Sequence, residues 1–108
     1  MQIKNKRIDA NGIKFFIEKD GREIARAYLY LMYNDMHEKP FGLLEDVFVE
    51  ESLRGQGIGT KLTQEIIKEA GKVCYKLICT SRYSREKVHS LYQKLGFKDH
   101  GKEFRIDF

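Results

Sequence analysis

Residues 54–60 read Arg54-Gly55-Gln56-Gly57-Ile58-Gly59-Thr60 and separate a β-like run, residues 43–49, from an amphipathic helical run, residues 58–70. Glycines at alternate positions have no Cβ atom, so the chain can turn sharply there and bring successive N–H groups close to a ligand. The helix that begins here points the positive end of its dipole at the same place. The segment therefore predicts a pyrophosphate cradle, and a strand-to-helix turn without a ligand is the alternative. The Arg54 guanidinium would meet a phosphate or stabilise the loop, unless it is simply solvated.

The composition is typical of a folded globular protein. The chain has 108 residues, of which 42% are hydrophobic and 33% charged, with one proline. Lysine and arginine number 20 against 16 acids, a net charge of +4, and the basic residues are interleaved with the acids along the whole length. We therefore expect a single domain over residues 1–108 that binds an anionic cofactor and no nucleic acid.

The sequence indicates neither a secretory signal nor a membrane span. Residues 1–6 contain lysines, but no apolar stretch follows them, and no segment approaches the length of a membrane-spanning helix. The odd spacing of Cys74 and Cys79 would place them on opposite faces of a strand, and no second Cys or His pair stands at metal-ligand spacing. We expect a cytoplasmic protein with unbonded cysteines, no metal and no membrane partner.

Hydrophobic periodicity predicts the order of the first elements. Alternation predicts strands over residues 13–18, 24–33 and 43–49, with a hairpin turn at residues 19–22. An apolar stripe predicts the helix over residues 58–70, ended by Gly71 as a C-terminal cap. A strand over residues 73–79 follows, parallel to residues 43–49 because a strand-helix-strand crossover joins them.

The C-terminal third predicts a second helix and a last strand. Ser84 is the expected N-cap, and Gly96-Phe97 the expected end, of a helix with one apolar stripe. Alternation in the tail indicates a strand with one buried face. The stripe consists of Val88, Leu91, Tyr92 and Leu95, and the alternating tail residues are Phe104, Ile106 and Phe108.

Three segments in this order resemble the core of the GNAT superfamily of acetyl-CoA-dependent N-acetyltransferases: residues 44–49, 54–60 and 91–97. The likeness covers about residues 13–108, and the glycine segment and the Tyr-x-x-x-Gly-Phe ending are its most specific parts. It implies an α/β fold whose mixed, mostly antiparallel sheet is splayed at a central parallel strand pair and flanked by two main helices. The helix pair that such proteins usually place after their first strand is reduced or absent here.

The resemblance also implies acetyl-CoA as co-substrate and assigns residues to it. Backbone groups of three residues would pair with the pantetheine arm like another strand, and the N–H groups of the glycine segment would hold the pyrophosphate. Arg85 would reach the 3′-phosphate or be solvated. The pantetheine-pairing residues are Val47, Phe48 and Val49, and the pyrophosphate-binding residues are Gly55, Gln56, Gly57, Ile58, Gly59 and Thr60.

Acetyl transfer from a thioester to an amine needs a base for the amine and a proton for the leaving thiolate. Glu45 is the candidate base because it interrupts an apolar strand near the split, with Asp46 as its rival and a structural ion pair as the alternative for either. Tyr92 resembles the general acid of the family, although its place on the apolar stripe also suits a core residue. His89, one turn earlier, shares that helix face.

The sequence therefore predicts an enzyme that moves the acetyl group of acetyl-CoA to a primary amine by direct attack, through a tetrahedral intermediate. A non-catalytic acyl-CoA-binding module or a partner-dependent subunit is the alternative. Without the helix pair, the acceptor side is open for a large substrate such as a protein amine, is completed by a second subunit in a homodimer, or has been lost. Side chains near that edge could receive a cationic small-molecule or protein amine: Tyr28, Tyr30, Tyr33, Asp35 and Glu38.

Overall fold

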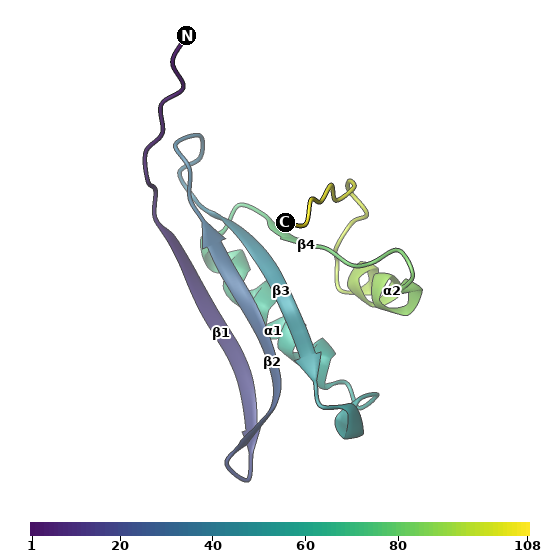
Figure 1. Cartoon of the computed structure of the whole chain (residues 1–108). Coiled ribbons are helices and arrows are strands. Elements are labelled where there is room, and N and C mark those ends of the chain that lie inside the picture. Colours follow the sequence, from purple (N-terminus) through teal and green to yellow (C-terminus); the bar gives the residue numbers. More distant parts are fainter.

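The computed structural model describes residues 1–108, and its centre is a four-stranded sheet in the order β1-β2-β3-β4. The first three strands are antiparallel and β4 is parallel to β3, which confirms the mixed, mostly antiparallel sheet (Figure 1). The elements along the chain are β1 (Ala10–Lys19), β2 (Arg22–Met32), β3 (Phe41–Val49), the 3-10 helix η1 (Glu51–Leu53), α1 (Ile58–Val73), β4 (Leu77–Cys79) and α2 (Glu86–Lys94).

A two-residue hairpin turn joins β1 to β2. Asp20 and Gly21 both have positive φ, 52° and 75°, which is the backbone of a type I′ turn and suits the twist of the flanking strands. The turn confirms the predicted hairpin at residues 19–22. Because β2 starts directly after it, no helix pair separates the first two strands.

The core lies between α1 and one face of the sheet. Alternate β2 residues point to α1, where the amphipathic helix supplies the opposing apolar surface. Figure 1 shows α1 behind the sheet, with no helix in front of β1 and β2. The buried cluster consists of Ala27, Leu29, Leu31, Leu44, Ile66 and Ala70.

The helix α2 ends in the glycine cap that the sequence predicted. Gly96 has φ +106°, and its N–H donates to the Gln93 carbonyl at 3.1 Å, while the N–H of Phe97 donates to the Tyr92 carbonyl at 3.0 Å. The rings of Tyr92 and Phe97 lie 5.4 Å apart. This hydrogen-bond pattern, with its ring contact, sets the position of Tyr92 at the end of the helix.

Two predicted helix boundaries were wrong. Gly71 does not end α1, because the helix continues to Val73 and the Cys74 N–H closes it on the Ala70 carbonyl at 2.8 Å. Lys72 supports this last turn through a 2.9 Å ion pair with Glu69, on the side of the helix dipole that favours a cation. Ser84 does not cap α2, whose N-cap is Arg85 without a side-chain hydrogen bond.

Two strand predictions near the C-terminus were also wrong: one strand is shorter than expected and the other is absent. The strand expected over residues 73–79 is limited to β4: α1 occupies residue 73, Cys74 is the C-cap of that helix, and residues 75–76 connect it to the strand. The alternating tail forms no strand, and Phe104 and Ile106 are 91% and 79% exposed. Alternation supplies one apolar face, but a strand also needs a neighbouring edge to accept its backbone hydrogen bonds, and no strand pairs with the tail.

No helix combines the length and the apolar character needed to cross a bilayer.

Candidate active site

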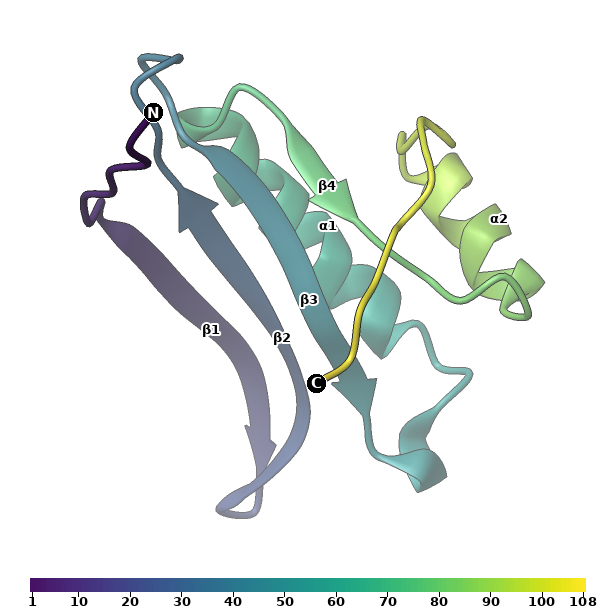
Figure 2. The ribbon, with the colours of Figure 1, turned by 45° about the horizontal axis from the view of Figure 1, so that its top comes forward.

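The parallel pairing of β3 with β4 stops halfway along β3. Only Gly42, Leu43 and Leu44 pair with β4, and the last of these pairs joins Leu44 to Cys79. Residues 45–49 continue without a partner on that side (Figure 2). This fork confirms the predicted splay, and it leaves a backbone edge that an extended ligand can pair with.

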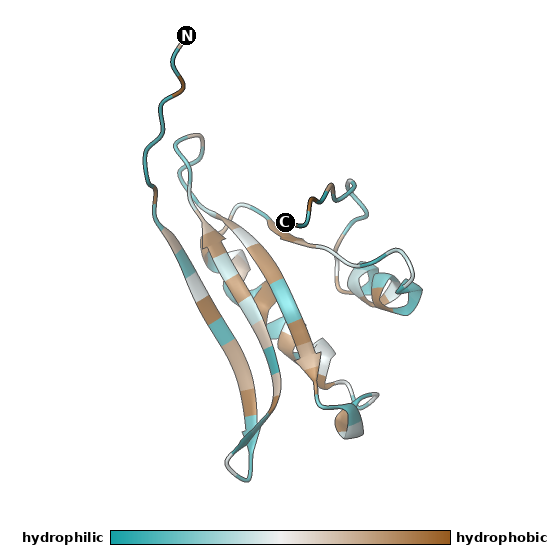
Figure 3. Cartoon of the chain, viewed as in Figure 1, coloured by the Kyte–Doolittle hydropathy of each residue, from teal (hydrophilic) through white to brown (hydrophobic).

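A β-bulge, which the strand pattern did not predict, lies at the fork. Tyr28 opposes Glu45 and Arg26 opposes Phe48, so one residue of β2 faces two residues of β3. Asp46, the first of these two, has φ +51°, a left-handed conformation that aspartate tolerates better than most residues. The signal in the sequence was the acidic pair within an apolar strand, seen in Figure 3 as a hydrophilic band on β3.

The bulge changes which side chains of β3 face α1. Before it, Leu44 lies in the core, whereas beyond it Val47 and Val49 approach Gly59 of α1, with methyl carbons 4.0 and 3.6 Å from the position of a Cβ there. Glu45 is half-buried and Asp46 is exposed. The bulge thus joins a core-forming half of the strand to a half that runs beside the start of α1.

The glycine segment has the geometry of an anion cradle. Gly55 and Gly57 have φ +83° and +82°, which only glycine adopts without strain. Gly57 is the N-cap of α1 and offers no side-chain partner, and the first turn of the helix contains no acid. The N–H groups of Ile58, Gly59 and Thr60 precede the first helical hydrogen bond, which runs from the Lys61 N–H to the Gly57 carbonyl at 3.0 Å. These residues therefore fit a diphosphate ligand.

Arg54 ties the glycine segment to the end of β3. Its Nε donates to the Val49 carbonyl at 2.9 Å, and its guanidinium lies 5.6 Å from the centre of the Phe48 ring. The carbonyl of Val49 is therefore already hydrogen-bonded, so the end of β3 has fewer free backbone groups than the sequence predicted.

Three ionisable side chains influence one another around the fork. Burial raises the pKa of Tyr92, the Cys79 and Glu45 charges raise it further, and Arg85 opposes them. Burial also raises the pKa of Glu45, with smaller contributions from Asp46 and Glu103. The pKa of Cys79 rises to about 11, first through burial and then through Glu45.

These shifts define what each group can do near neutral pH. Tyr92 keeps its phenolic proton and can donate a hydrogen bond, whereas Glu45 becomes a stronger proton acceptor as its pKa rises. Cys79 stays a thiol and is a poor nucleophile. The three residues come from β3, β4 and α2, and the charge of Glu45 acts on both Cys79 and Tyr92.

Arg85, the N-cap residue of α2, and His89, within α2, are the other two candidates from this region. Arg85, at the N-cap, is exposed, and its charge lowers the pKa of Tyr92, so it acts near the phenol. His89 places its Nε2 2.8 Å from the Arg82 carbonyl, which ties the ring to the loop before α2. His89 is therefore engaged outside the group formed by Glu45, Cys79 and Tyr92.

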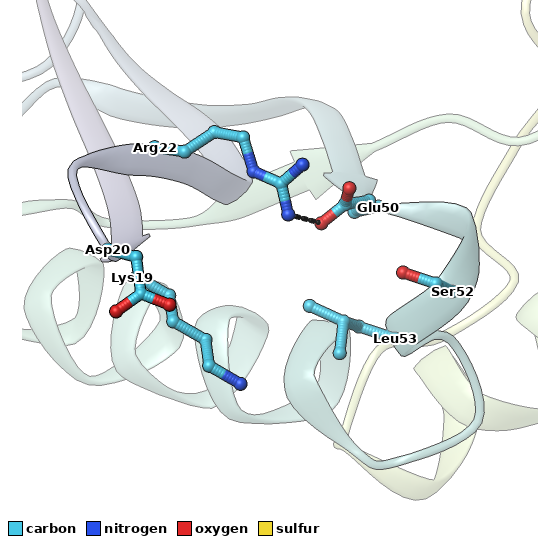
Figure 4. Close-up of a pocket in the computed structure, with 6 residues that line it drawn as sticks. All are labelled: Lys19, Asp20, Arg22, Glu50, Ser52 and Leu53. Atoms are coloured by element: carbon cyan, nitrogen blue, oxygen red, sulfur yellow. Dashed lines mark hydrogen bonds and ion pairs between the residues drawn. The ribbon is translucent and has the colours of Figure 1, made fainter.

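A polar hollow of about 460 Å³ lies away from the fork, between the β1–β2 turn and η1 (Figure 4). Arg22 crosses it to Glu50 at 3.0 Å. None of the predicted site residues lines this hollow, whose residues are Lys19, Asp20, Arg22, Glu50, Ser52 and Leu53.

The model of the acetyltransferase (GNAT) family matches residues 2–97. Since that is most of the chain, the protein belongs to the GNAT acetyltransferase family. A glucosamine 6-phosphate N-acetyltransferase of Trypanosoma brucei brucei is 40% identical over 67 residues, which cover 61% of this chain and 44% of that protein. The chain spans less than half the length of the curated relatives it matches.

Solved structures agree with this assignment. A crystallised Trypanosoma brucei acetyltransferase is 32% identical with a TM-score of 0.77, and the match covers 92% of this chain and 69% of that one. The glucosamine-6-phosphate N-acetyltransferase of Arabidopsis thaliana also has a TM-score of 0.77, covering 90% and 67%. Its identity is 21%, so that likeness concerns the fold alone.

Proposed function

We propose that this protein is an acetyl-CoA-dependent N-acetyltransferase that transfers the acetyl group directly to a primary amine. The observation that carries the proposal is the fork between β3 and β4 near the free N-terminus of α1, with the charge of Glu45 on β3 acting on the phenol of Tyr92 on α2. An activated acetyl group, an acceptor for the amine proton and a donor for the leaving sulfur are the requirements of the reaction.

In this proposal, the cofactor supplies the activated acetyl thioester. Backbone N–H groups of residues 55–60 hold its diphosphate, and the edge of β3 at residues 47–49, apart from the Val49 carbonyl that Arg54 occupies, pairs with its pantetheine amides. Arg54 connects the glycine segment to the end of β3 through its hydrogen bond to the Val49 carbonyl. The charge of Arg85 influences the Tyr92 phenol, and in this proposal its guanidinium contacts the 3′-phosphate.

The chain's own residues then have distinct tasks. Glu45 accepts the proton that the amine loses as the C–N bond forms, and Tyr92 hydrogen-bonds the sulfur as the C–S bond breaks. A thiol of pKa about 8.5 is more acidic than a phenol of pKa about 10, so a hydrogen bond is favoured over full proton transfer. Because Cys79 stays protonated, no acetyl group is routed through it.

The test measures free thiol released from acetyl-CoA in the presence of a panel of amines. Tyr92→Phe should lower kcat about a hundredfold, within the range of general acid-base contributions, and leave the KM for acetyl-CoA near that of the wild type. Tyr83→Phe is the matched control, because Tyr83 is 80% exposed. Equal activity of the wild type and Tyr92→Phe would refute the role of the phenol.

A non-catalytic acyl-CoA-binding module, or a subunit that needs a partner, is the second candidate. The absence of a helix in front of β1 and β2 favours this second candidate, because fewer side chains would surround an acceptor on that face. Calorimetric binding of coenzyme A without turnover of any amine would support this alternative. Amine-dependent turnover would exclude the pure binding module, and absence of coenzyme A binding would defeat both.

For the acceptor, we propose an amino sugar phosphate, because the matching Trypanosoma relative is named for glucosamine 6-phosphate. We also propose a cytoplasmic location and a homodimer in which the second copy helps to close the acceptor side. Light scattering coupled to gel filtration tests the dimer, and a single species with the mass of one chain would contradict it.

A further inference from the structure

A row of three side chains crosses the open face of the sheet. Tyr28 on β2 lies directly opposite Lys14 on β1 and directly opposite Glu45 on β3, and residues in such antiparallel pairs share one face. The Nζ atom of Lys14 lies 5.9 Å from the centre of the Tyr28 ring, which agrees with this placement. The row thus reads cation, aromatic ring, carboxylate.

The cationic end of the row carries two cations that contact the same acid. Lys14 bonds one carboxylate oxygen of Glu23, and Arg26 Nη1 lies 3.4 Å from the other. Two cations therefore share one carboxylate. Elsewhere Arg22 has Glu50, and Lys72 has Glu69, as separate partners.

The middle of the row is a flat aromatic surface. The rings of Tyr28 and Tyr30 are stacked, with centroids 6.1 Å apart and planes inclined by 5°. α1 packs on the other face of the sheet, so these rings are not part of the core cluster. Rings of this kind combine a broad apolar body with a polar hydroxyl, which suits contact with a sugar ring.

The ends of the row are separated by two strand spacings, about 10 Å between backbones. An amino sugar phosphate has its amine and its phosphate on opposite sides of one six-membered ring. The row can therefore receive both charged groups of one such molecule at once.

We propose that Lys14, assisted by Arg26, binds the anionic group of the acceptor, with the sugar ring over Tyr28 and the amine at Glu45. This inference rests on the proposed acetyltransferase function and gives it a specificity-determining site. The strand β1 thereby has a task in recognition, although it lies two strands away from the fork. Lysine acts here as a point charge for phosphate oxygens.

The experiment compares two acceptors, glucosamine 6-phosphate and glucosamine, in steady-state kinetics. Lys14→Met should raise the KM for glucosamine 6-phosphate about tenfold, the low end for a charged contact because the site is partly exposed. It should leave kcat, the KM for acetyl-CoA and the KM for glucosamine unchanged. Lys14→Arg should restore most of the lost affinity.

Lys72→Met is the matched control, because Lys72 also forms a surface ion pair but on α1. Equal changes in KM for both acceptors, or no change for either, would overturn the proposal. If no amine is turned over, the proposed function fails on its own account. Calorimetric titration of glucosamine 6-phosphate into the wild type and Lys14→Met would then still decide the binding role, and equal affinities would refute it.

Discussion

Replacing Gly57 by alanine should destabilise the protein, whereas the same change at Gly71, in the same helix, should stabilise it. Gly57 caps α1 with φ +82°, and a Cβ placed there meets no atom within 4 Å. Its penalty is therefore backbone strain alone, about 1–2 kcal/mol for an L-residue in the left-handed region. The penalty does not depend on any contact that the surroundings could relax.

Gly71 differs only in its backbone. It lies inside α1 with no positive φ, and its Cβ position is also open within 4 Å. Alanine is favoured over glycine in a helix interior by about 0.5–1 kcal/mol. The free energies of unfolding of the two variants should therefore differ by about 1.5–3 kcal/mol, the sum of the two effects.

Urea unfolding followed by circular dichroism measures this difference directly, with an unchanged m-value as the check that the unfolded state is the same. In thermal melts the gap should be roughly 6–24 °C for a domain of about this size. A destabilised Gly71→Ala variant would contradict the extension of α1 to Val73. A neutral Gly57→Ala variant would refute the left-handed cap, and with it the geometry of the anion cradle.

Three further predictions concern the bulge, the buried thiol and the core. Asp46→Val should cost about 1–3 kcal/mol because a β-branched residue resists φ +51°, whereas Asp46→Gly should keep or raise stability in the same urea assay. Ultraviolet absorbance of a Cys74→Ser variant should show Cys79 ionising near pH 11; since its folded pKa is raised, its contribution to stability is complete below about pH 9 and is lost as pH rises through 11. A midpoint near the usual thiol value would contradict the burial of this side chain. Leu29→Ala, at a fully buried position, should cost about 2–5 kcal/mol. Phe104→Ala, at a 91% exposed position, should change stability by less than about 0.5 kcal/mol, and a similar loss in both would place the tail in the core.

Local chemistry made the regular elements predictable. The Asp20-Gly21 pair carries its own turn geometry, and the ending at Gly96 carries its own hydrogen-bond pattern. The stripe of α1 identified the buried face of that helix before any partner was known. Each of these signals depends on residues within a few positions of one another.

The ends of helices and strands were less predictable where the same residues suit two different local structures. Gly71 is compatible with a helix end and with a helix interior, and the pairing of Lys72 with Glu69 supports the second. The tail has the alternation of a strand, but pairing depends on an edge elsewhere in the chain. Glu45 and Tyr92 could be chosen as candidates from motifs, whereas their electrostatic influence on each other depends on where α2 lies relative to β3 and β4.

The hairpin, the amphipathic helix, the glycine segment and their order could be read from neighbouring residues alone, because short-range sterics and periodicity specify each of them. The point where β3 leaves β4, the bulge at Asp46 and the row formed by Lys14, Tyr28 and Glu45 became visible only in the folded chain. Strand register and bulges arise from pairing between distant segments, and a shift of one residue would send every side chain to the other face.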